Sequence, residues 1–361
     1  MIRGHGGNTH DLARALGCPL DAIIDMSSNV NPFGPPSDLL THLKERLLRI
    51  GALPEVDGRS AVERFAGHWG IPPEEVVIGS GTTQLIYDLP RALDARRALI
   101  IGPTYADYRD GCLRNKVDCD FWLARKENGF QPDANAIREA LAGFDTVYIC
   151  NPNNPTGALL SRKALTTLCR QFPDIHFVVD ESYLPFVDTA EPVSLLTDRP
   201  SNVVVLHSLS KIFRIPGLRI GFAVGEAGIV KRLRDRTLPW NVNSLALEAL
   251  HYLLDEGQAA AMECFVQETR TRLTEERTAM MARLAAIPDI RLFASTTGFF
   301  VIRLPEPHRS EAVCRQLAAE KILVRDCANF KGLSDRFIRI SLQDSTTNHQ
   351  CAAILEAILT R

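Results

Sequence analysis

The stretch that decides the fold is SLSKIFRIPGLRIG at residues 208–221, with Lys211 near its start. It closely follows the apolar run VVVL at 203–206, and Arg219 lies eight residues after the lysine. A lysine just after a buried strand, flanked by hydroxyl groups, suits an amine that bonds covalently to a carbonyl group next to a phosphate. Ser208 and Arg219 could hold the phosphate dianion. A lone lysine in a loop is more often a surface residue, so this interpretation depends on the rest of the sequence.

Short apolar runs alternate with helical patterns between residues 76 and 224. The runs are rich in Val and Ile and lie between polar or Gly/Pro turns, which is typical of strands buried on both faces. Helical patterns such as 82–93 and 161–171 separate several of them. This alternation predicts an α/β domain whose central, mostly parallel sheet is sandwiched by helices. The expected strands are 76–78, 98–101, 146–150, 176–179, 203–206 and 220–224.

The remainder of the chain indicates a second, smaller α+β domain. A long helical stretch at 244–286, interrupted near Gly257, could lead into it. Two strand candidates at 299–304 and 337–342 surround a helical pattern at 310–320. The turn-rich segment SSNVNPFGPP near the N-terminus is suited to crossing a cleft. We therefore expect an N-terminal arm at 1–40, a large domain at 41–245, and a connecting helix with a small domain at 246–361.

The composition is that of an ordinary globular protein with no polyanion-binding signal. The 361 residues carry a net charge of −2, and 45% of them are apolar. No apolar run approaches the roughly 18 residues of a membrane helix, and the start lacks the apolar core of a signal peptide. The nine cysteines form no C-x-x-C pair. These features predict a cytoplasmic protein that binds neither nucleic acid nor membrane, and they suggest no metal site.

Polar residues follow two of the expected strands. Asp180 ends the run at 176–179, and Tyr183 comes three residues later. A carboxylate at that place can pair with a protonated ring nitrogen, and the tyrosine can donate to a ring oxygen. Asn154, in CNPNNPTG at 150–157, could donate to the same oxygen. Taken singly, the tyrosine fits a half-buried core residue equally well, and the asparagine fits a plain turn.

Two further signals come from the turns that follow neighbouring strands. The sequence GSGTT at 79–83 lets backbone N–H groups approach a phosphate at a helix N-terminus. Tyr105 follows another strand and could stack on a flat ring. Because α/β sheets bind ligands at strand ends, these weak signals fall in one place and match different parts of one cofactor. The sequence therefore predicts a pyridoxal-phosphate (PLP) site.

These motifs resemble the fold-type I PLP-dependent enzymes of the class I/II aminotransferase superfamily, over nearly the whole chain. The resemblance implies the PLP-dependent transferase fold, a homodimer with sites at the subunit interface, and PLP as the cofactor. It implies Lys211 as the covalent anchor, Asp180 at the pyridine nitrogen, and Asn154 and Tyr183 at the phenolate oxygen, with these four as the catalytic set. Tyr105 would lie over the ring. The residues implied around the phosphate are Ser80, Gly81, Thr82, Ser208, Ser210 and Arg219.

Other motifs distinguish two branches of that superfamily. NPNNPTG and DESY are shared with histidinol-phosphate aminotransferases, so they do not discriminate. HGGN at 5–8, DMSSNVNPFG at 25–34, LPWNVNSLA at 238–246 and ILVRDCANF at 322–330 resemble the L-threonine-O-3-phosphate decarboxylases of cobalamin biosynthesis. That resemblance implies conversion of L-threonine O-3-phosphate to (R)-1-aminopropan-2-yl phosphate. An aminotransferase of the histidinol-phosphate type is the alternative, and a non-catalytic PLP-binding protein is a second alternative.

A substrate that bears both a carboxylate and a phosphate needs two cationic anchors. Arg325 and Arg339 can each form bidentate pairs with such groups. By resemblance, Arg339 binds the substrate carboxylate, whereas Arg325 and His5 line the substrate phosphate site. Decarboxylation and transamination differ in which bond at the substrate Cα stands perpendicular to the cofactor ring. The sequence does not reveal that orientation, nor does it separate phosphothreonine from phosphoserine.

Several neighbouring residues complete the expected substrate site. Gly6 and Gly7 follow His5 and are expected beside it. Asn29 and Asn31 are both candidates for polar contacts in the cleft, and Asn31 is preferred because it directly precedes Pro-x-Gly. One departure concerns the dimer: relatives often carry Tyr-Pro-Asp where this chain has Leu-Pro-Glu at 53–55. The tyrosine contact to the cofactor phosphate of the neighbouring subunit is therefore absent or replaced.

Overall fold

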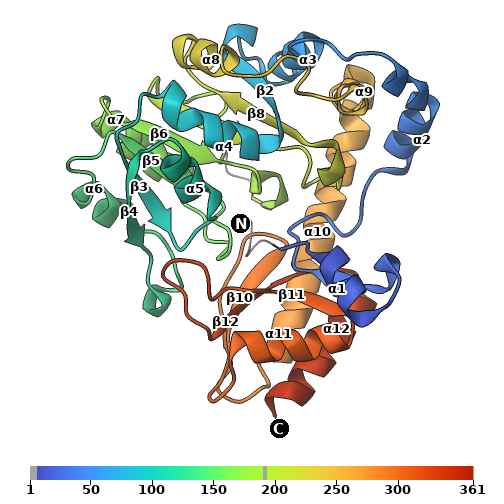
Figure 1. The fold of residues 1–361 in the computed structure, drawn as a ribbon. Helices are drawn as coiled ribbons and strands as arrows, with labels where there is room; N and C mark the ends of the chain where they lie inside the picture. The colour runs from blue at the N-terminus through green and yellow to red at the C-terminus, as the bar shows by residue number, and fades with distance from the viewer. Residues whose placement is uncertain (1–5, 190–192, 361) are drawn as a thin grey trace.

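The larger of two sheets in the computed structural model has seven strands in the order β2-β8-β7-β6-β5-β3-β4 (Figure 1). The neighbours from β7 to β4 pair in parallel, whereas β8 runs antiparallel to both β7 and β2. The structure describes residues 6–189 and 193–360. In sheet order the strands are β2 (Val76–Ser80), β8 (Ile220–Val224), β7 (Val203–His207), β6 (His176–Asp180), β5 (Thr146–Cys150), β3 (Arg97–Gly102) and β4 (Asp118–Leu123).

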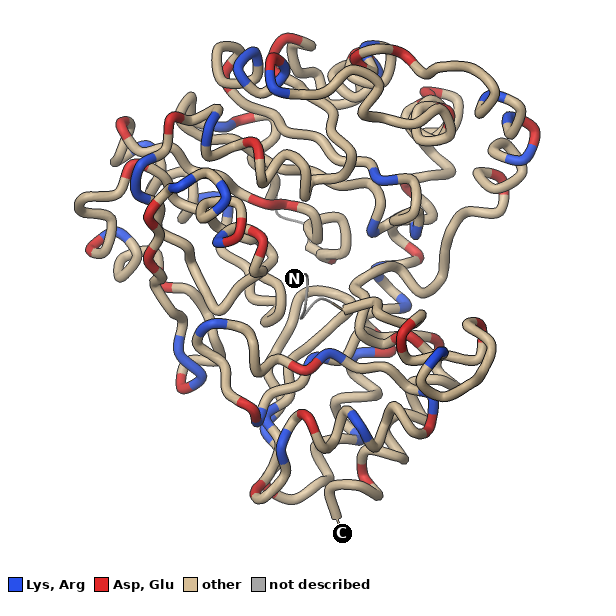
Figure 2. Tube along the Cα trace, in the orientation of Figure 1, with Lys and Arg blue, Asp and Glu red and all other residues tan. Residues whose placement is uncertain are grey.

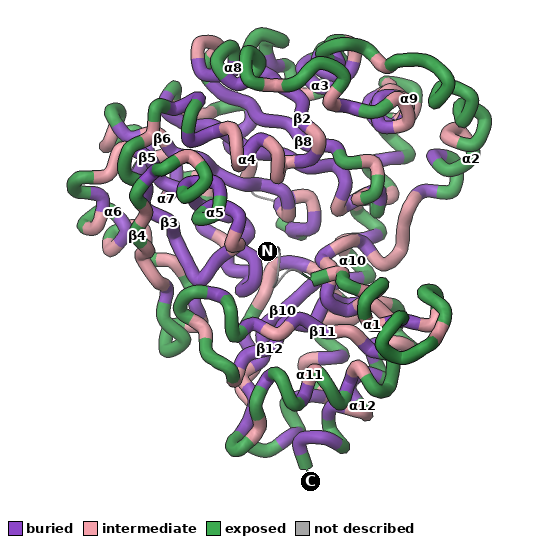
Figure 3. Tube along the Cα trace, viewed as in Figure 1, coloured by how far each residue is buried: buried purple, intermediate pink, exposed green. Residues whose placement is uncertain are grey.

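Helices cover both faces of this sheet, which explains why its central strands are apolar without alternation. Val204 of β7 belongs to one apolar cluster, and its neighbours Val203 and Val205 belong to another. The central strands are accordingly buried, and exposed residues lie on the outer sides of the helices (Figure 3). One face is covered by α4 (Gly81–Ala92), α5 (Asp107–Arg114) and α8 (Ala227–Arg234). The other is covered by α3 (Arg59–Trp69), α6 (Ala134–Glu139), α7 (Arg162–Gln171) and α9 (Ser244–Leu253).

The smaller sheet has five strands in the order β1-β11-β12-β10-β9, and only β1 and β11 pair in parallel. Its apolar face packs against the C-terminal helices, where Val324 and Ile340 share a cluster with Leu317 and Leu355. The strands are β1 (Ile24–Met26), β9 (Arg291–Leu292), β10 (Phe299–Arg303), β11 (Ile322–Asp326) and β12 (Phe337–Ser341). The remaining helices are α1 (Thr9–Leu16), α2 (Ser37–Glu45), α10 (Ala259–Leu284), α11 (Ser310–Ala319) and α12 (Ser345–Leu359).

Two local differences from the sequence-based expectation have physical causes. The strand β4 was not predicted, because DCDFWL is only partly buried at the edge of the sheet and lacks a continuous apolar run. The helical stretch expected at 244–286 is two helices, α9 and α10. A short 3₁₀ turn at Glu256–Gln258 separates them, and Asp255 caps it by accepting from Gly257 N. Glycine disfavours a continuous helix at that point.

Charged residues of both signs are spread over both parts of the molecule (Figure 2). Among the described residues, no helix combines the length and the apolar character that a membrane crossing requires.

Candidate active site

The side chains singled out in the sequence gather in one cavity between the two sheets. Segments that follow β3, β5, β6 and β7 supply one wall, and β11, β12 and the segment after β1 supply the other. Of the predicted residues, those that line the cavity are Gly6, Thr82, Tyr105, Asn154, Asp180, Tyr183, Lys211, Arg325 and Arg339. Asn29, the second candidate beside Asn31, also lines it, and the lining residues to which the sequence assigned no role are Ser27, Ser28, Thr83, Ala106, Tyr108, Cys150, Ser182, Asn329 and Phe330.

Lys211 lines this cavity and is half-buried. Burial lowers the pKa of its amine to about 8, the guanidinium of Arg219 lowers it as well, and the carboxylate of Asp180 opposes both effects. A larger share of the amine is therefore neutral near pH 7 than for an exposed lysine. A neutral amine is the nucleophilic form, so the environment of Lys211 favours attack on a carbonyl group.

Asp180 is a buried carboxylate held by two donors. Ser182 N donates to Oδ1 at 2.9 Å, and the hydroxyl of Tyr108 donates to Oδ2 at 2.8 Å. Burial raises the pKa of this carboxyl group, and these hydrogen bonds oppose that rise by stabilising the charged form. Each carboxylate oxygen retains a second lone pair, so the group can still accept a proton donor from the cavity. Sequence reasoning missed Tyr108; its spacing of three residues from Tyr105 was the available signal.

One end of the cavity brings a helix N-terminus close to a guanidinium group. The N-terminus of α4, a helix of 12 residues, lies there, and Thr82 and Thr83 of its first turn line the cavity. A Cβ atom at Gly81 would lie 2.4 Å from Arg219 Nη2, so the absence of a side chain lets the guanidinium approach this helix end. Backbone N–H groups and a cation together favour a dianion.

Of the residues predicted around the phosphate, only Thr82 lines the cavity, and Gly81, Arg219 and the three serines do not. The hydroxyls of Ser208 and Ser210 are oriented toward the Ile220 carbonyl, at 3.5 Å and 3.0 Å. Ser80 precedes α4, and its backbone N–H donates to Gln84 Oε1. These three serines therefore lie outside the cavity wall.

Arg339 is a buried cation with no carboxylate to neutralise it among the described residues. Its side chain donates to Asn154 Oδ1 and to the Ser27 carbonyl, and its Nε is buried without a partner. Only 4% of the residue is exposed. Desolvation disfavours such a guanidinium, and lowers its pKa. Because an unpaired buried charge is costly, this site is set up for an anion that enters from the cavity.

Arg325 lies directly beside Arg339 on the neighbouring strand, since the two residues are register partners of β11 and β12. Its guanidinium donates to Asn329 Oδ1 at 2.7 Å and lies 5.0 Å from the centre of the Phe330 ring. Asn329 and Phe330 also line the cavity, although the sequence offered them only as part of a motif. Two adjacent arginines give this end of the cavity the capacity to bind two anionic groups.

The structure corrects one predicted contact, that of Asn31. This side chain is completely buried outside the cavity wall, and its amide donates to the Ile212 carbonyl at 2.8 Å and to Thr269 Oγ1 at 2.9 Å. Asn29 lines the cavity in its place, and its Nδ2 is buried with no partner in the part of the chain that the structure describes. The preference for Asn31 was therefore wrong, because its amide is occupied in holding the Lys211 loop against α10.

The N-terminal segment reaches the same wall. A Cβ atom at Gly6 would lie 2.2 Å from the Ser27 carbonyl, so only glycine allows this approach. Gly7 has a φ of +81° and donates from its backbone N–H to Ser27 Oγ at 2.7 Å, but it does not line the cavity. His5 lies outside the described residues.

Comparisons with known proteins agree with this arrangement. The model of the family "Aminotransferase class I and II" matches residues 21–358. The chain is 30% identical over 362 residues to the threonine-phosphate decarboxylase of Salmonella typhimurium, covering 99% of this chain and 96% of that protein. It is also 30% identical over 365 residues to the histidinol-phosphate aminotransferase of Roseiflexus castenholzii, covering 96% and 92%.

Solved structures give the same answer for the fold. The crystal structure of L-threonine-O-3-phosphate decarboxylase from Porphyromonas gingivalis superposes with a TM-score of 0.83 at 28% identity, covering 94% of this chain and all of that one. The aspartate aminotransferase of Thermus thermophilus with maleate has the same fold, with a TM-score of 0.84 at 19% identity. The chain thus belongs to the class I and II aminotransferase family and is a PLP-dependent enzyme.

Proposed function

We propose that this enzyme decarboxylates L-threonine O-3-phosphate to (R)-1-aminopropan-2-yl phosphate for cobalamin biosynthesis. The observation that carries the proposal is the pair of register partners Arg325 and Arg339 at one end of the cavity. Such a pair suits an amino acid that bears both a carboxylate and a phosphate. Similarity to the threonine-phosphate decarboxylase of Salmonella typhimurium along almost the whole chain supports the same substrate class.

The geometry of the other wall supports an assignment of the cofactor-binding residues. We assign Lys211 as the covalent anchor, Asp180 as the partner of the pyridine nitrogen, and Arg219 with the start of α4 as the phosphate site. Asn154 and Tyr183 would donate to the phenolate oxygen; Asn154 Oδ1 accepts from Arg339, which leaves its Nδ2 as the donor. Tyr105 would cover the ring. When bound, PLP supplies a conjugated ring that accepts the electron pair released at the substrate Cα.

The chain's own residues would then control which bond breaks. Arg339 would hold the carboxylate, and Arg325 would hold the substrate phosphate with Asn329 beside it. By holding these two groups, the anchors would orient the substrate so that the Cα–carboxylate bond breaks and CO₂ leaves. The amine of Lys211 would return a proton to Cα and complete the product.

Incubation of the holoenzyme with L-threonine O-3-phosphate tests the proposal. We expect release of CO₂ and formation of 1-aminopropan-2-yl phosphate, with L-threonine turning over far more slowly because it lacks the phosphate. The kcat/KM for phosphoserine should lie within about 10-fold to 200-fold of that for phosphothreonine, because the two substrates differ by only one methyl group. Formation of a keto acid that depends on 2-oxoglutarate would favour the aminotransferase alternative, which the Roseiflexus similarity supports. Absence of any turnover with either substrate would favour a non-catalytic PLP-binding protein.

The lowered pKa of Lys211 leads to a prediction about pH. Burial and Arg219 disfavour the ammonium form, so the neutral amine should predominate above about pH 8 instead of above 10.5. The rate at which the apoenzyme captures PLP should therefore rise with pH and level off soon above 8. Asp180→Asn should shift this profile to lower pH, because it removes the charge that stabilises the ammonium form. Growth of the visible cofactor absorbance after mixing, followed across the pH range, measures the profile. A profile that still rises steeply beyond pH 10 would contradict the prediction.

Tyr108 is expected to position the Asp180 carboxylate and to stabilise its charged form, without touching the substrate. Tyr108→Phe removes the hydroxyl donor but keeps the ring, and a hydrogen bond to a charged group contributes about 1.5–3 kcal/mol. We expect kcat/KM to fall roughly 10-fold to 100-fold and the absorbance spectrum of the bound cofactor to shift. Tyr148→Phe is the matched control: this ring is equally buried and stacks on Tyr108 at 5.6 Å, but its hydroxyl donates to no carboxylate in the described chain. Equal effects of both substitutions would indicate a packing role instead.

A homodimer is part of the same proposal. Exposed apolar side chains gather on one surface, made of residues 47–56 and 238–240, where Trp240 N donates to the Val56 carbonyl. Leu48 is 92% exposed and Leu53 75%. An apolar surface of this kind on a globular enzyme typically marks a protein interface.

Leu48→Glu should therefore weaken association at least tenfold, because it places a charge in an apolar contact. Sedimentation equilibrium of the variant at several concentrations measures this. Leu113→Glu, which changes an apolar residue 52% exposed on α5, should leave the assembly unchanged. A wild-type chain that sediments as a monomer would refute the dimer.

A further inference from the structure

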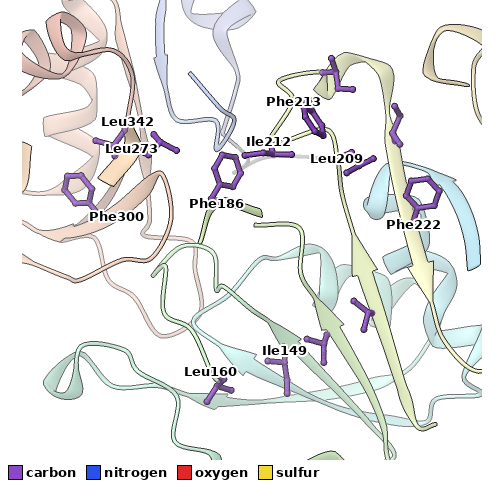
Figure 4. Packing of buried hydrophobic residues seen from close by; sticks show 14 of the residues in the cluster. Ile149, Leu160, Phe186, Leu209, Ile212, Phe213, Phe222, Leu273, Phe300 and Leu342 are labelled. Carbon is purple, nitrogen blue, oxygen red and sulfur yellow. The ribbon is translucent and has the colours of Figure 1, made fainter. Parts of the chain in front are cut away.

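A second cavity of about 430 Å³ lies behind the Lys211 loop. Leu209, Ile212 and Phe213 of this loop line it, and these side chains are shown in Figure 4. Lys211 itself lines the active-site cavity, and the two cavities share no lining residue. The loop therefore separates two chambers, of which the proposed chemistry uses only one.

The walls of this second cavity are mainly apolar. Met262 and Val266 of α10 lie opposite the loop, together with Leu253 and Leu254 at the end of α9. A chamber of this size, apolar with a few polar groups, is typical of small-molecule sites.

The charged groups around the cavity nearly cancel. Arg162 is paired with Asp198 at 2.8 Å, and the lining residues Arg270 and Glu263 of α10 carry opposite charges. Neither sign predominates, so the lining gives no advantage to an ion. An uncharged ligand fits these walls best.

His207 contributes a polar side chain to the lining of this second cavity. Its ring lies between Phe65 and Trp69, at centroid distances of 5.6 Å and 5.7 Å, and only 4% of the residue is exposed. Nδ1 of His207 and Nε1 of Trp69 are both buried without a hydrogen-bond partner among the described residues. Burial lowers the pKa of His207 to about 4, so at neutral pH its imidazole is neutral and offers one donor and one acceptor. Because His207 lines the cavity, its neutral imidazole is a polar group that a bound molecule could meet there.

We propose that this second cavity binds a small, uncharged, mainly apolar molecule whose hydroxyl or amide group bonds to His207. The apolar body would rest on Leu209, Ile212 and Phe213. The site goes beyond the proposed decarboxylation and does not depend on it, because it shares no residue with the active-site cavity.

Benzyl alcohol and ethylbenzene make a matched pair of probes, because they have nearly the same shape and differ by the hydroxyl. Binding of each to the holoenzyme can be measured by saturation-transfer NMR titration. We expect saturable binding of benzyl alcohol. His207→Phe keeps an aromatic ring between Phe65 and Trp69 but has no nitrogen. It should weaken benzyl alcohol roughly fivefold to tenfold and leave ethylbenzene unchanged.

A second variant keeps the test independent of His207. Val266→Trp, on a half-buried position of α10, should fill the cavity and abolish binding of both probes while thermal unfolding stays cooperative. No saturable binding to the wild type would mean that water alone fills the cavity and would overturn the proposal. Equal affinity of benzyl alcohol for wild type and His207→Phe, or undiminished binding to Val266→Trp, would overturn it as well. These titrations do not involve turnover, so failure of the proposed decarboxylation would leave their outcome unaffected.

Discussion

Lys211→Ala is expected to abolish covalent cofactor attachment and to lower kcat/KM at least about 1,000-fold. Two roles would be lost together, because we assign to the same amine both the anchoring of the cofactor and the return of the proton to the substrate Cα. No other lysine lines the cavity in the described chain, so no neighbour can substitute. The loss should appear both in turnover of L-threonine O-3-phosphate and in the visible absorbance of the purified protein.

The control for this variant is another lysine. Lys231→Ala, which removes an exposed amine paired with Asp235 on α8, should leave both readouts unchanged. Added methylamine should restore part of the turnover of Lys211→Ala, since a small free amine can occupy the vacated space and move a proton. Unchanged turnover in Lys211→Ala would refute the covalent role, and lost turnover with retained cofactor absorbance would restrict the lysine to proton transfer.

The central sheet could be predicted from the sequence because a strand that is buried on both faces is a continuous apolar run. All six expected strands of the large domain lie within strands of the seven-stranded sheet. The edge strand β4 has no continuous apolar run, because its exposure to solvent permits the polar residues Asp118 and Asp120. Local composition therefore predicts the strands that tertiary packing covers, and misses those at the boundary.

That Lys211, Asp180, Asn154 and Tyr105 line one cavity was equally predictable, because each ends or follows one of the parallel strands β7, β6, β5 and β3. Such residues are brought to one edge by topology alone. Contacts between distant segments could not be predicted in this way. Asn31 bonds to residues 181 and 238 positions away, and Tyr108 bonds to Asp180 across 72 positions. No local pattern records such partners, which is why Asn31 was misassigned and Tyr108 was missed.

Arg339→Leu is expected to lower kcat/KM for L-threonine O-3-phosphate roughly 100-fold to 1,000-fold, because the substrate carboxylate would enter a buried site without its cation. Stability should respond differently. The native guanidinium is desolvated and unpaired, so its removal relieves a cost that offsets the loss of its bonds to Asn154 and Ser27. We expect the free energy of unfolding to change by less than about 2 kcal/mol.

Ligand-induced stabilisation separates binding from folding at this site. Phosphothreonine should raise the melting temperature of the wild-type holoenzyme but not that of Arg339→Leu, because a ligand stabilises a fold only through its affinity for it. Arg303→Leu, on the adjacent strand β10 and outside the cavity wall, should keep the full shift. Arg339→Lys retains the charge but loses the bidentate geometry, so its activity should lie between those of wild type and Arg339→Leu. If Arg339→Leu kept its turnover, the carboxylate would have to be held elsewhere, and Arg325 would become the principal candidate.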